Sequence, residues 1–239
     1  MVMLTNISKI LLAFMVLLLG EIDAPSKYKV STKVAPYVPG TFQPDKLKSV
    51  FQKSLDALKT EKVHLFYLHA PDRTVPIEDI LSAVQELYEQ GKFEEFGLSN
   101  YFAWEVSAIC EYMKHKNWVM PTVYQGHYNA FMRTIEPALV PCFRQYNIRF
   151  YAYSPLSGGI VDPKNRGNAN SSGGCFDPKG PYSQHYRSLY WKQGYFDTLD
   201  LRTRFLKEMD WTQLTLCFDG SSTTPRNHTW WIFVRAYQE

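Results

Sequence analysis

Polar side chains recur through the middle of this chain, each at the end of a short apolar run. Five such positions are spaced about 30 residues apart, the length of one βα unit: Lys33, His69, Ser99 with Asn100, Gln125 and Tyr153. Charged and amide groups at the same end of successive parallel strands converge on one face of a sheet or barrel, where ligands bind and chemistry takes place. The spacing therefore predicts a polar binding or catalytic site.

The stretch around His69 indicates how these groups are positioned. Residues 63–69 form a nearly continuous apolar run, and a helical pattern follows at 77–91. Such a run before a helix is typical of a parallel strand buried on both faces, and Pro71 helps to end it. A lone histidine in a strand is more often a satisfied core residue. The other four polar strand ends favour a site instead.

The same reading applied along the chain gives strands that alternate with helices. The expected strands are residues 28–34, 63–69, 93–99, 121–128 and 149–153. The expected helices are residues 44–60, 77–91, 103–116 and 135–146. Strands and helices alternating at this pitch predict βαβ units around a parallel sheet, and hence an α/β fold.

Composition narrows the classes of function. The chain has 239 residues and 45% hydrophobic content, enough for one large core or two small ones. Its net charge is +3, with both signs interspersed, so no basic stripe predicts a nucleic-acid partner. The four cysteines form no CxxC pair and the histidines form no HExxH motif, so no metal site is expected.

Residues 1–24 differ in character from the remainder. Lys9 precedes ten consecutive apolar residues, and Gly20 ends the run. Ten residues are too few for a membrane span, which takes about 20, but they suit the apolar core of a signal peptide. A buried helix is the alternative. We expect a cytoplasmic protein with membrane association unlikely, or a secreted or membrane-associated one if residues 1–24 are a genuine leader.

From Tyr28 to about Tyr190 the chain resembles the aldo-keto reductases, specifically the aflatoxin-aldehyde reductase branch. The matching stretches are STK at 31–33, LFYLHAPD at 65–72, GLSNY at 97–101, VYQG at 123–126 with Tyr128-Asn129, and FYAYSPLSGG at 150–159. The resemblance implies part of a (β/α)8 TIM barrel that binds NADPH and reduces aldehydes or ketones to alcohols by hydride transfer. It also implies a small-molecule carbonyl substrate and a possible homodimer.

The resemblance also implies roles for individual residues. Lys33 matches the lysine whose cation lowers the pKa of a proton-donating tyrosine, and His69 matches the histidine that polarises the substrate carbonyl. The residues matching nicotinamide and pyrophosphate contacts are Ser99, Asn100, Gln125, Tyr153, Ser154, Leu156, Ser157 and Gly158. Lys164 falls near a family lysine, although Asp162-Pro163 replaces the Thr-Gly expected there.

Both ends depart from the family pattern. The family's catalytic aspartate and tyrosine belong to a DTAxxY motif before the Lys33 strand, and residues 1–20 contain neither residue type. We therefore expect an apolar leader or gene-model artefact at 1–24, a partial barrel at 25–209, and a divergent tail at 210–239 that a frameshift could explain. The predicted function is an NADPH-dependent reductase with impaired turnover. The alternatives are a non-catalytic NADP(H)-binding regulatory protein and a truncated product without function.

Overall fold

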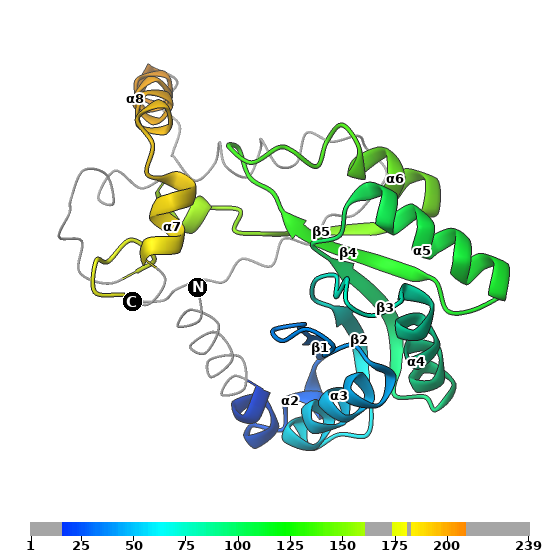
Figure 1. Ribbon diagram of the computed structural model, residues 1–239. Helices are drawn as coiled ribbons and strands as arrows, with labels where there is room; N and C mark the ends of the chain where they lie inside the picture. The colour runs from blue at the N-terminus through cyan, green and yellow to red at the C-terminus, as the bar shows by residue number, and fades with distance from the viewer. Residues whose placement is uncertain (1–15, 161–173, 181–182, 209–239) are drawn as a thin grey trace. The chain divides into compact units, whose positions relative to one another are not determined.

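A computed structural model describes residues 16–160, 174–180 and 183–208 (Figure 1). The chain divides into two compact units. The first unit comprises residues 1–126 and 136–150, and the second comprises residues 127–135 and 151–239.

One five-stranded sheet carries the fold, with its strands in sequence order. The strands are β1 (Ser31–Val34), β2 (Val63–Leu68), β3 (Phe93–Ser99), β4 (Pro121–His127) and β5 (Arg149–Tyr153). The pairings of β1 with β2, β2 with β3 and β3 with β4 are parallel. Lys33 lies opposite Tyr67, which lies opposite Gly97. This arrangement confirms the predicted α/β class and matches part of a (β/α)8 barrel.

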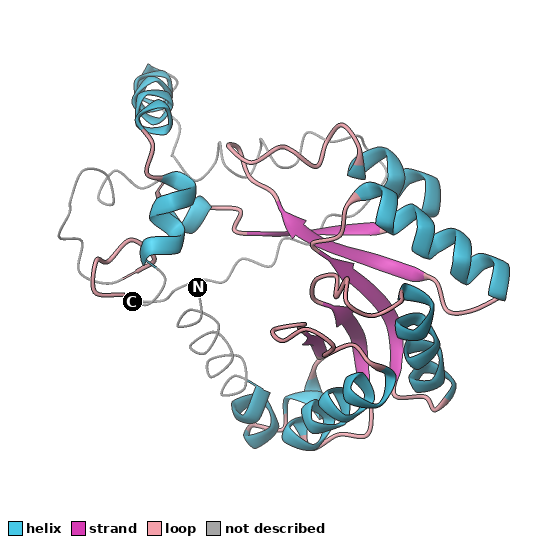
Figure 2. Cartoon of the chain, in the orientation of Figure 1, coloured by secondary structure: helices cyan, strands magenta, loops and turns pink. Residues whose placement is uncertain are grey.

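Helices connect the strands and lie along the outer side of the sheet in the first unit (Figure 2). They are α2 (Ala24–Lys27), α3 (Pro44–Leu58), α4 (Ile77–Glu89), α5 (Ala103–Lys116) and α6 (Leu139–Tyr146). The second unit contains the 3-10 turn η1 (Ser157–Gly159), α7 (Ser183–Tyr190) and α8 (Gln193–Glu208).

Two expected elements begin later than their sequence patterns predict. The helix expected at 135–146 begins at Leu139, which places Pro141 in the first turn, where its missing backbone N–H needs no partner within the helix. The strand expected at 28–34 begins at Ser31, because Tyr28 forms the C-terminal cap of α2 and pairing with β2 starts only at Ser31.

Aromatic rings fill the core between the sheet and the first helices. The Phe66 ring on β2 lies 4.5 Å from that of Phe51 on α3 and 5.4 Å from that of Phe93 on β3, measured between centroids. All three residues are almost fully buried. Apolar residues on one stripe of α3, including Leu47 and Leu55, therefore hold this helix against the strands.

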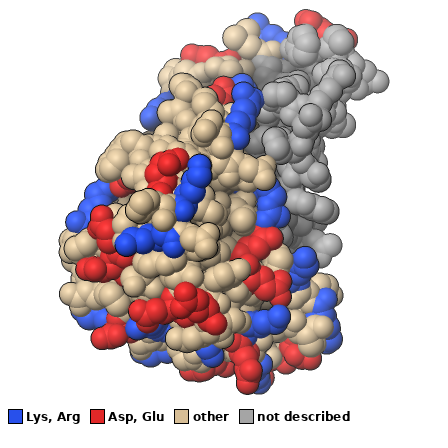
Figure 3. Space-filling model, turned by 90° about the vertical axis from the view of Figure 1, so that its right-hand side faces the viewer, with Lys and Arg blue, Asp and Glu red and all other residues tan. Residues whose placement is uncertain are grey.

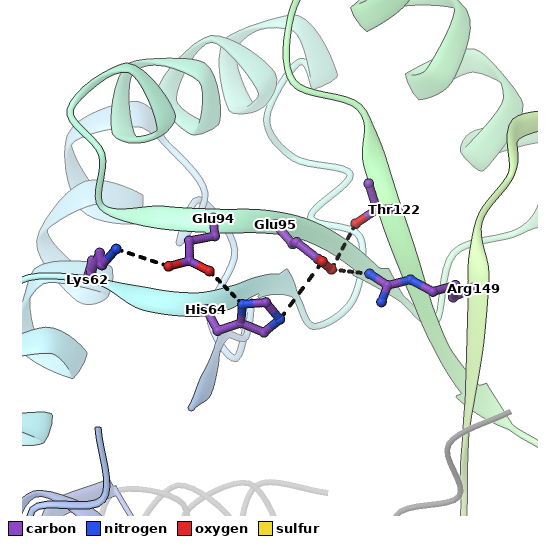
Figure 4. Close-up of polar contacts among 6 residues, drawn as sticks. All are labelled: Lys62, His64, Glu94, Glu95, Thr122 and Arg149. Atoms are coloured by element: carbon purple, nitrogen blue, oxygen red, sulfur yellow. Dashed lines mark hydrogen bonds and ion pairs between the residues drawn. The ribbon is translucent and has the colours of Figure 1, made fainter. Parts of the chain in front are cut away.

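An ionic network ties the amino ends of four neighbouring strands together (Figure 4). Glu95 Oε2 accepts hydrogen bonds from Arg149 and, at 3.2 Å, from Thr122 Oγ1. His64 Nδ1 lies 2.8 Å from Glu94 Oε2, and Lys62 Nζ donates to Glu94 Oε1 at 3.0 Å. In parallel barrels this end of the sheet serves stability, whereas chemistry occupies the opposite end.

The second unit has a small aromatic and aliphatic core of its own. Its buried members are Ile160, Phe176, Tyr190 and Leu199. Arg187 on α7 donates two hydrogen bonds to the Phe176 carbonyl, at 3.2 and 2.9 Å, and stacks on the Trp191 ring at 4.5 Å. These contacts fix α7 against the segment that precedes it.

Charge is mixed on the face seen in Figure 3, where basic and acidic side chains alternate without a large patch of one sign. Within the described ranges, no helix has the length and apolarity needed to cross a membrane. The same ranges hold no group of three or more His, Cys, Asp and Glu side chains placed to hold a metal ion.

Candidate active site

Lys33 is the centre of the polar group in the first unit. Its Nζ donates a hydrogen bond to Gln125 Oε1 on β4 and lies 5.1 Å above the centre of the Tyr67 ring on β2. Because β2 and β3 separate β1 from β4, this contact requires both side chains to project from the same, inward-curving face of the sheet. Gly97 leaves room for the Tyr67 ring, since a Cβ there would lie 2.5 Å from two ring atoms.

Burial changes the charge behaviour of Lys33. Its ammonium is partly withdrawn from water, and this desolvation lowers its pKa to about 8. Lys48, Lys59 and Lys62, by contrast, each form an ion pair with a carboxylate. Within the described part of the chain, Lys33 has only the neutral amide of Gln125 as a hydrogen-bond partner.

His69 follows β2 directly, and its backbone N–H donates to the Val34 carbonyl at 2.9 Å. Its Nδ1 is buried and has no hydrogen-bond partner among the described residues. Burial, and then the charge of Lys33, lower the pKa of the imidazole to about 4. The ring is therefore neutral at pH 7, with one nitrogen able to donate and the other able to accept.

Asn100 connects the ends of β2 and β3. Its backbone is left-handed, with φ of 62°, which asparagine tolerates better than most residues. Its side-chain Nδ2 donates to the His69 carbonyl at 2.8 Å and to Ser99 Oγ at 3.0 Å. Ser99 lies opposite Gln125 in the pairing of β3 with β4. The structure thus brings Lys33, His69, Ser99, Asn100 and Gln125 together at the carboxyl edge of the sheet.

The second unit holds the other predicted residues, beginning with Tyr153 at the end of β5. The His127 ring stacks on the Tyr153 ring, with centroids 5.0 Å apart and planes 9° from parallel. Burial raises the pKa of the Tyr153 phenol. His127 Nε2 also forms a short hydrogen bond with the Tyr190 hydroxyl, and Asn129 Nδ2 donates to that hydroxyl at 3.2 Å.

A tight turn follows β5 and contains the expected pyrophosphate segment. Ser154, Ser157 and Gly158 all have positive φ, at 55°, 53° and 71°. The Ser157 N–H donates to the Ser154 carbonyl at 3.0 Å, while its Oγ is buried without a partner among the described residues. A Cβ at Gly158 would lie 2.5 Å from the Tyr186 ring, and Leu156 packs against the core of this unit. Lys164 lies outside the described residues.

Three residues that shape these groups were not anticipated from the sequence: Tyr67, Gly97 and His127. Tyr67 stands two residues before His69 and in register with Lys33, so strand alternation could have identified it. A glycine inside a strand, such as Gly97, often marks a close approach by another group. The stacking of His127 on Tyr153 has no comparable signal, because the two residues lie on different strands.

A separate cavity of about 320 Å³ lies between α4 and α5, away from the Lys33 group. Apolar side chains, including Ile80 and Ile109, make up most of its lining. Tyr101 also lines it, but the hydroxyl of this residue is buried and has no partner among the described residues. The ion pair of Arg73 with Glu105, at 2.9 Å, stands beside it.

A parallel βα sheet with polar groups at the carboxyl ends of its strands is the arrangement in which barrel enzymes place their ligand sites. A family model described as the Aldo/keto reductase family matches residues 15–195. The chain belongs to this family of oxidoreductases, as the sequence resemblance predicted.

The relatives point to the same branch. The chain is 39% identical over 204 residues to aflatoxin B1 aldehyde reductase member 4 from Homo sapiens, covering 84% of this chain and 60% of that protein. It is 42% identical over 184 residues to aflatoxin B1 aldehyde reductase member 2 from Rattus norvegicus, covering 75% and 49%. It is 43% identical over 164 residues to aldo-keto reductase pigE from Monascus ruber, covering 67% and 48%. The chain thus spans about half to three fifths of the length of these relatives.

Proposed function

We propose that this protein is an NADPH-dependent reductase of aldehydes, with slow turnover by the chain on its own. The observation that carries the proposal is the convergence of Lys33, His69, Asn100 and Gln125 at one edge of the sheet. A neutral imidazole beside a cation and two amides suits a polarised carbonyl and a planar amide-bearing ring better than a charged substrate. Membership of the aldo/keto reductase family agrees with this chemistry.

The residues of each unit, taken separately, fit a part of a dinucleotide. In the first unit, the side-chain amides of Asn100 and Gln125, with the Ser99 hydroxyl, suit a nicotinamide carboxamide. In the second unit, the Tyr153 ring suits a stacked aromatic ring, and the buried Ser157 Oγ, which has no partner among the described residues, and the close-approaching backbone at Gly158 suit a phosphate. When bound, NADPH would provide the hydride for carbonyl reduction.

The chain's own residues would bind and polarise the carbonyl. His69, neutral at pH 7, can donate one ring N–H to the carbonyl oxygen and so stabilise the negative charge that develops there. Lys33 can add a positive field when protonated. Asn100 fixes the backbone of His69 through its 2.8 Å hydrogen bond to the His69 carbonyl, which orients the imidazole.

Slow turnover is proposed because Lys33 contacts an amide instead of a carboxylate. In the family pattern, an aspartate holds this lysine and the lysine activates a tyrosine, whereas among the described residues the Gln125 amide holds the Lys33 amine. Reduction without a positioned proton donor is slower by roughly 10²–10⁴-fold. The same observation favours a second candidate, a protein that binds NADP(H) without reducing a substrate.

The test combines a binding and a turnover measurement on the full chain. NADPH is titrated against the fluorescence of the six tryptophans, and its oxidation is followed with 2-carboxybenzaldehyde. We expect micromolar binding and slow oxidation that His69→Ala abolishes. Binding without oxidation would favour the second candidate, and no binding would overturn both in favour of a product without function. Turnover at ordinary enzyme rates would contradict the proposed impairment.

Two variants separate the proposed subsites. Ser157→Ala is expected to weaken NADPH binding, since it removes a hydroxyl that has no partner among the described residues, while leaving the His69 group intact. Ser54→Ala is the matched control, because the exposed Ser54 hydroxyl donates to the Val50 carbonyl of its own helix, α3. Equal NADPH affinity in the two variants would remove Ser157 from the proposed site.

A further inference from the structure

Lys33 differs from the exposed lysines in what surrounds its amine. Lys59 and Lys62 are paired with Glu21 and Glu94 at 2.9 and 3.0 Å, and their side chains are 59% and 62% exposed. Among the residues that the structure describes, the groups that face Lys33 are the Tyr67 ring, the His69 imidazole and the Gln125 amide. None of these three carries a negative charge at neutral pH, so none of them compensates the charge of the partly buried ammonium.

The consequence is a substantial population of free amine near neutral pH. Burial lowers the pKa of Lys33 to about 8. In about a quarter of the molecules the Lys33 amine is then unprotonated at pH 7.5, compared with about one in a thousand for an ordinary lysine. Hydrogen bonding to Gln125 Oε1 does not prevent this, because a neutral amine also donates through N–H and keeps its lone pair.

The position of Lys33 also allows a small molecule to approach it. Lys33 is only half-buried, and its amine lies on the inward-curving face of the sheet, where it contacts Gln125. His69 is neutral at pH 7 and has a buried nitrogen without a partner among the described residues. A carbonyl oxygen placed toward this imidazole would have its carbon turned toward the neighbouring amine.

We propose that Lys33 is a covalent capture site for aldehydes and forms a reversible Schiff base with them. The amine lone pair of Lys33 attacks the carbonyl carbon, a C–N bond forms, and the carbonyl electron pair moves to oxygen, which takes up a proton while nitrogen releases one. Loss of water from this carbinolamine gives the imine. Amine and aldehyde become imine and water, with no oxidation or reduction.

This activity goes beyond the proposed reduction and does not depend on it. No nucleotide takes part in imine formation, so the site can hold an aldehyde in a chain that turns over slowly or not at all. Conversely, a chain that reduces aldehydes efficiently without an adduct would keep the proposed family activity and lose this one. The two proposals can therefore fail separately.

The experiment traps the imine in the full-length chain. The protein is incubated with benzaldehyde at pH 7.5 without nucleotide, reduced with sodium cyanoborohydride, digested, and analysed by peptide mass spectrometry. The trapped residue gains the mass of the aldehyde less one oxygen. We expect modification of Lys33 at least about tenfold above that of Lys59 and Lys62, because burial makes the neutral fraction of Lys33 roughly 200-fold larger than the ordinary lysine pKa would give at pH 7.5.

Comparison within one molecule keeps the test independent of folding in any variant. If solvent exposure governed the reaction, Lys59 and Lys62 would be modified more than Lys33, and that result would overturn the proposal. Modification of Lys33 should also reach half its maximum near pH 8. Lys33→Arg, which retains a cation, should lose the adduct at this peptide only. A Lys33 profile that follows the exposed lysines would equally refute the inference.

Discussion

Gly97→Ala should disturb both stability and the Lys33 site. Gly97 lies opposite Tyr67 in the pairing of β2 with β3. A Cβ built there lies 2.5 Å from two atoms of the Tyr67 ring and 3.3 Å from a third. Carbon atoms pack at about 3.5–4.0 Å, so the ring must move by roughly an ångström or the strands must separate. Tyr67 is only 2% exposed, which leaves the ring little room to move.

The expected magnitude follows from two opposing effects. Overpacking of a filled core costs about 1–3 kcal/mol. Replacing glycine by alanine also restricts the unfolded chain, which offsets about 0.4–1 kcal/mol where the backbone is compatible, and Gly97 has no positive φ. The free energy of unfolding should therefore fall by about 0.5–2.5 kcal/mol. Because the Lys33 amine lies above the displaced ring, trapping of Lys33 by benzaldehyde should change as well.

The assay is urea unfolding followed by intrinsic fluorescence, with a double-mutant cycle against Tyr67→Leu. If the ring causes the loss, Gly97→Ala should cost much less in the Tyr67→Leu background, giving a coupling energy of about 0.5–2 kcal/mol. Gly194→Ala is the control, since a Cβ there meets nothing within 4 Å. An equal loss in both Tyr67 backgrounds would refute the steric explanation.

Three further predictions concern charged groups. Asp72→Ala should lower the free energy of unfolding by about 2–4 kcal/mol, because it leaves the buried Phe42 N–H without an acceptor. Burial alone would raise the pKa of Asp72, but hydrogen bonds hold this pKa below its usual value. The contribution of Asp72 to stability should therefore persist above pH 4 and be lost as the pH falls through the lowered pKa. The pKa of Lys33 in the folded chain is lowered to about 8, so between about pH 8 and the ordinary lysine pKa the unfolded chain binds more protons than the folded chain. The free energy of unfolding should therefore rise with pH across that range. Lys33→Met should remove this rise, as measured by urea midpoints at several pH values. Glu95→Ala should lower the unfolding free energy by about 1–2 kcal/mol, since Arg149 and Thr122 both donate to Glu95, and an unchanged urea midpoint would contradict a stabilising role for that network.

The local pattern of apolar and polar residues was enough to predict where most helices and strands of this protein lie in the sequence. The strand at Phe93–Ser99, the helix at Ala103–Lys116 and the strand at Arg149–Tyr153 agree with their sequence predictions at both ends. Alternation, helical periodicity and chain breakers act over a few residues, so they can be read without knowing the fold. The predicted start of α6 was wrong, because a helix begun at residue 135 would have Pro141 in its interior.

The sequence also determined that polar residues end successive strands at one edge of a parallel sheet. This follows from the spacing of the strands along the sequence, because each βα unit returns the chain to the same edge of the sheet. It is why Lys33, His69 and Asn100 could be grouped before their contacts were known. The family resemblance added roles for these residues, which remain predictions to be tested by the experiments above.

Only the tertiary structure decided which groups these residues contact. Lys33 meets Gln125, 92 positions along the chain, because the sheet curves and two strands separate them. Because Gly97 has no Cβ, the Tyr67 ring can lie beneath the lysine, and burial of the amine lowers the pKa of Lys33. Curvature and desolvation depend on all the neighbours at once, so no local pattern of residues can specify them.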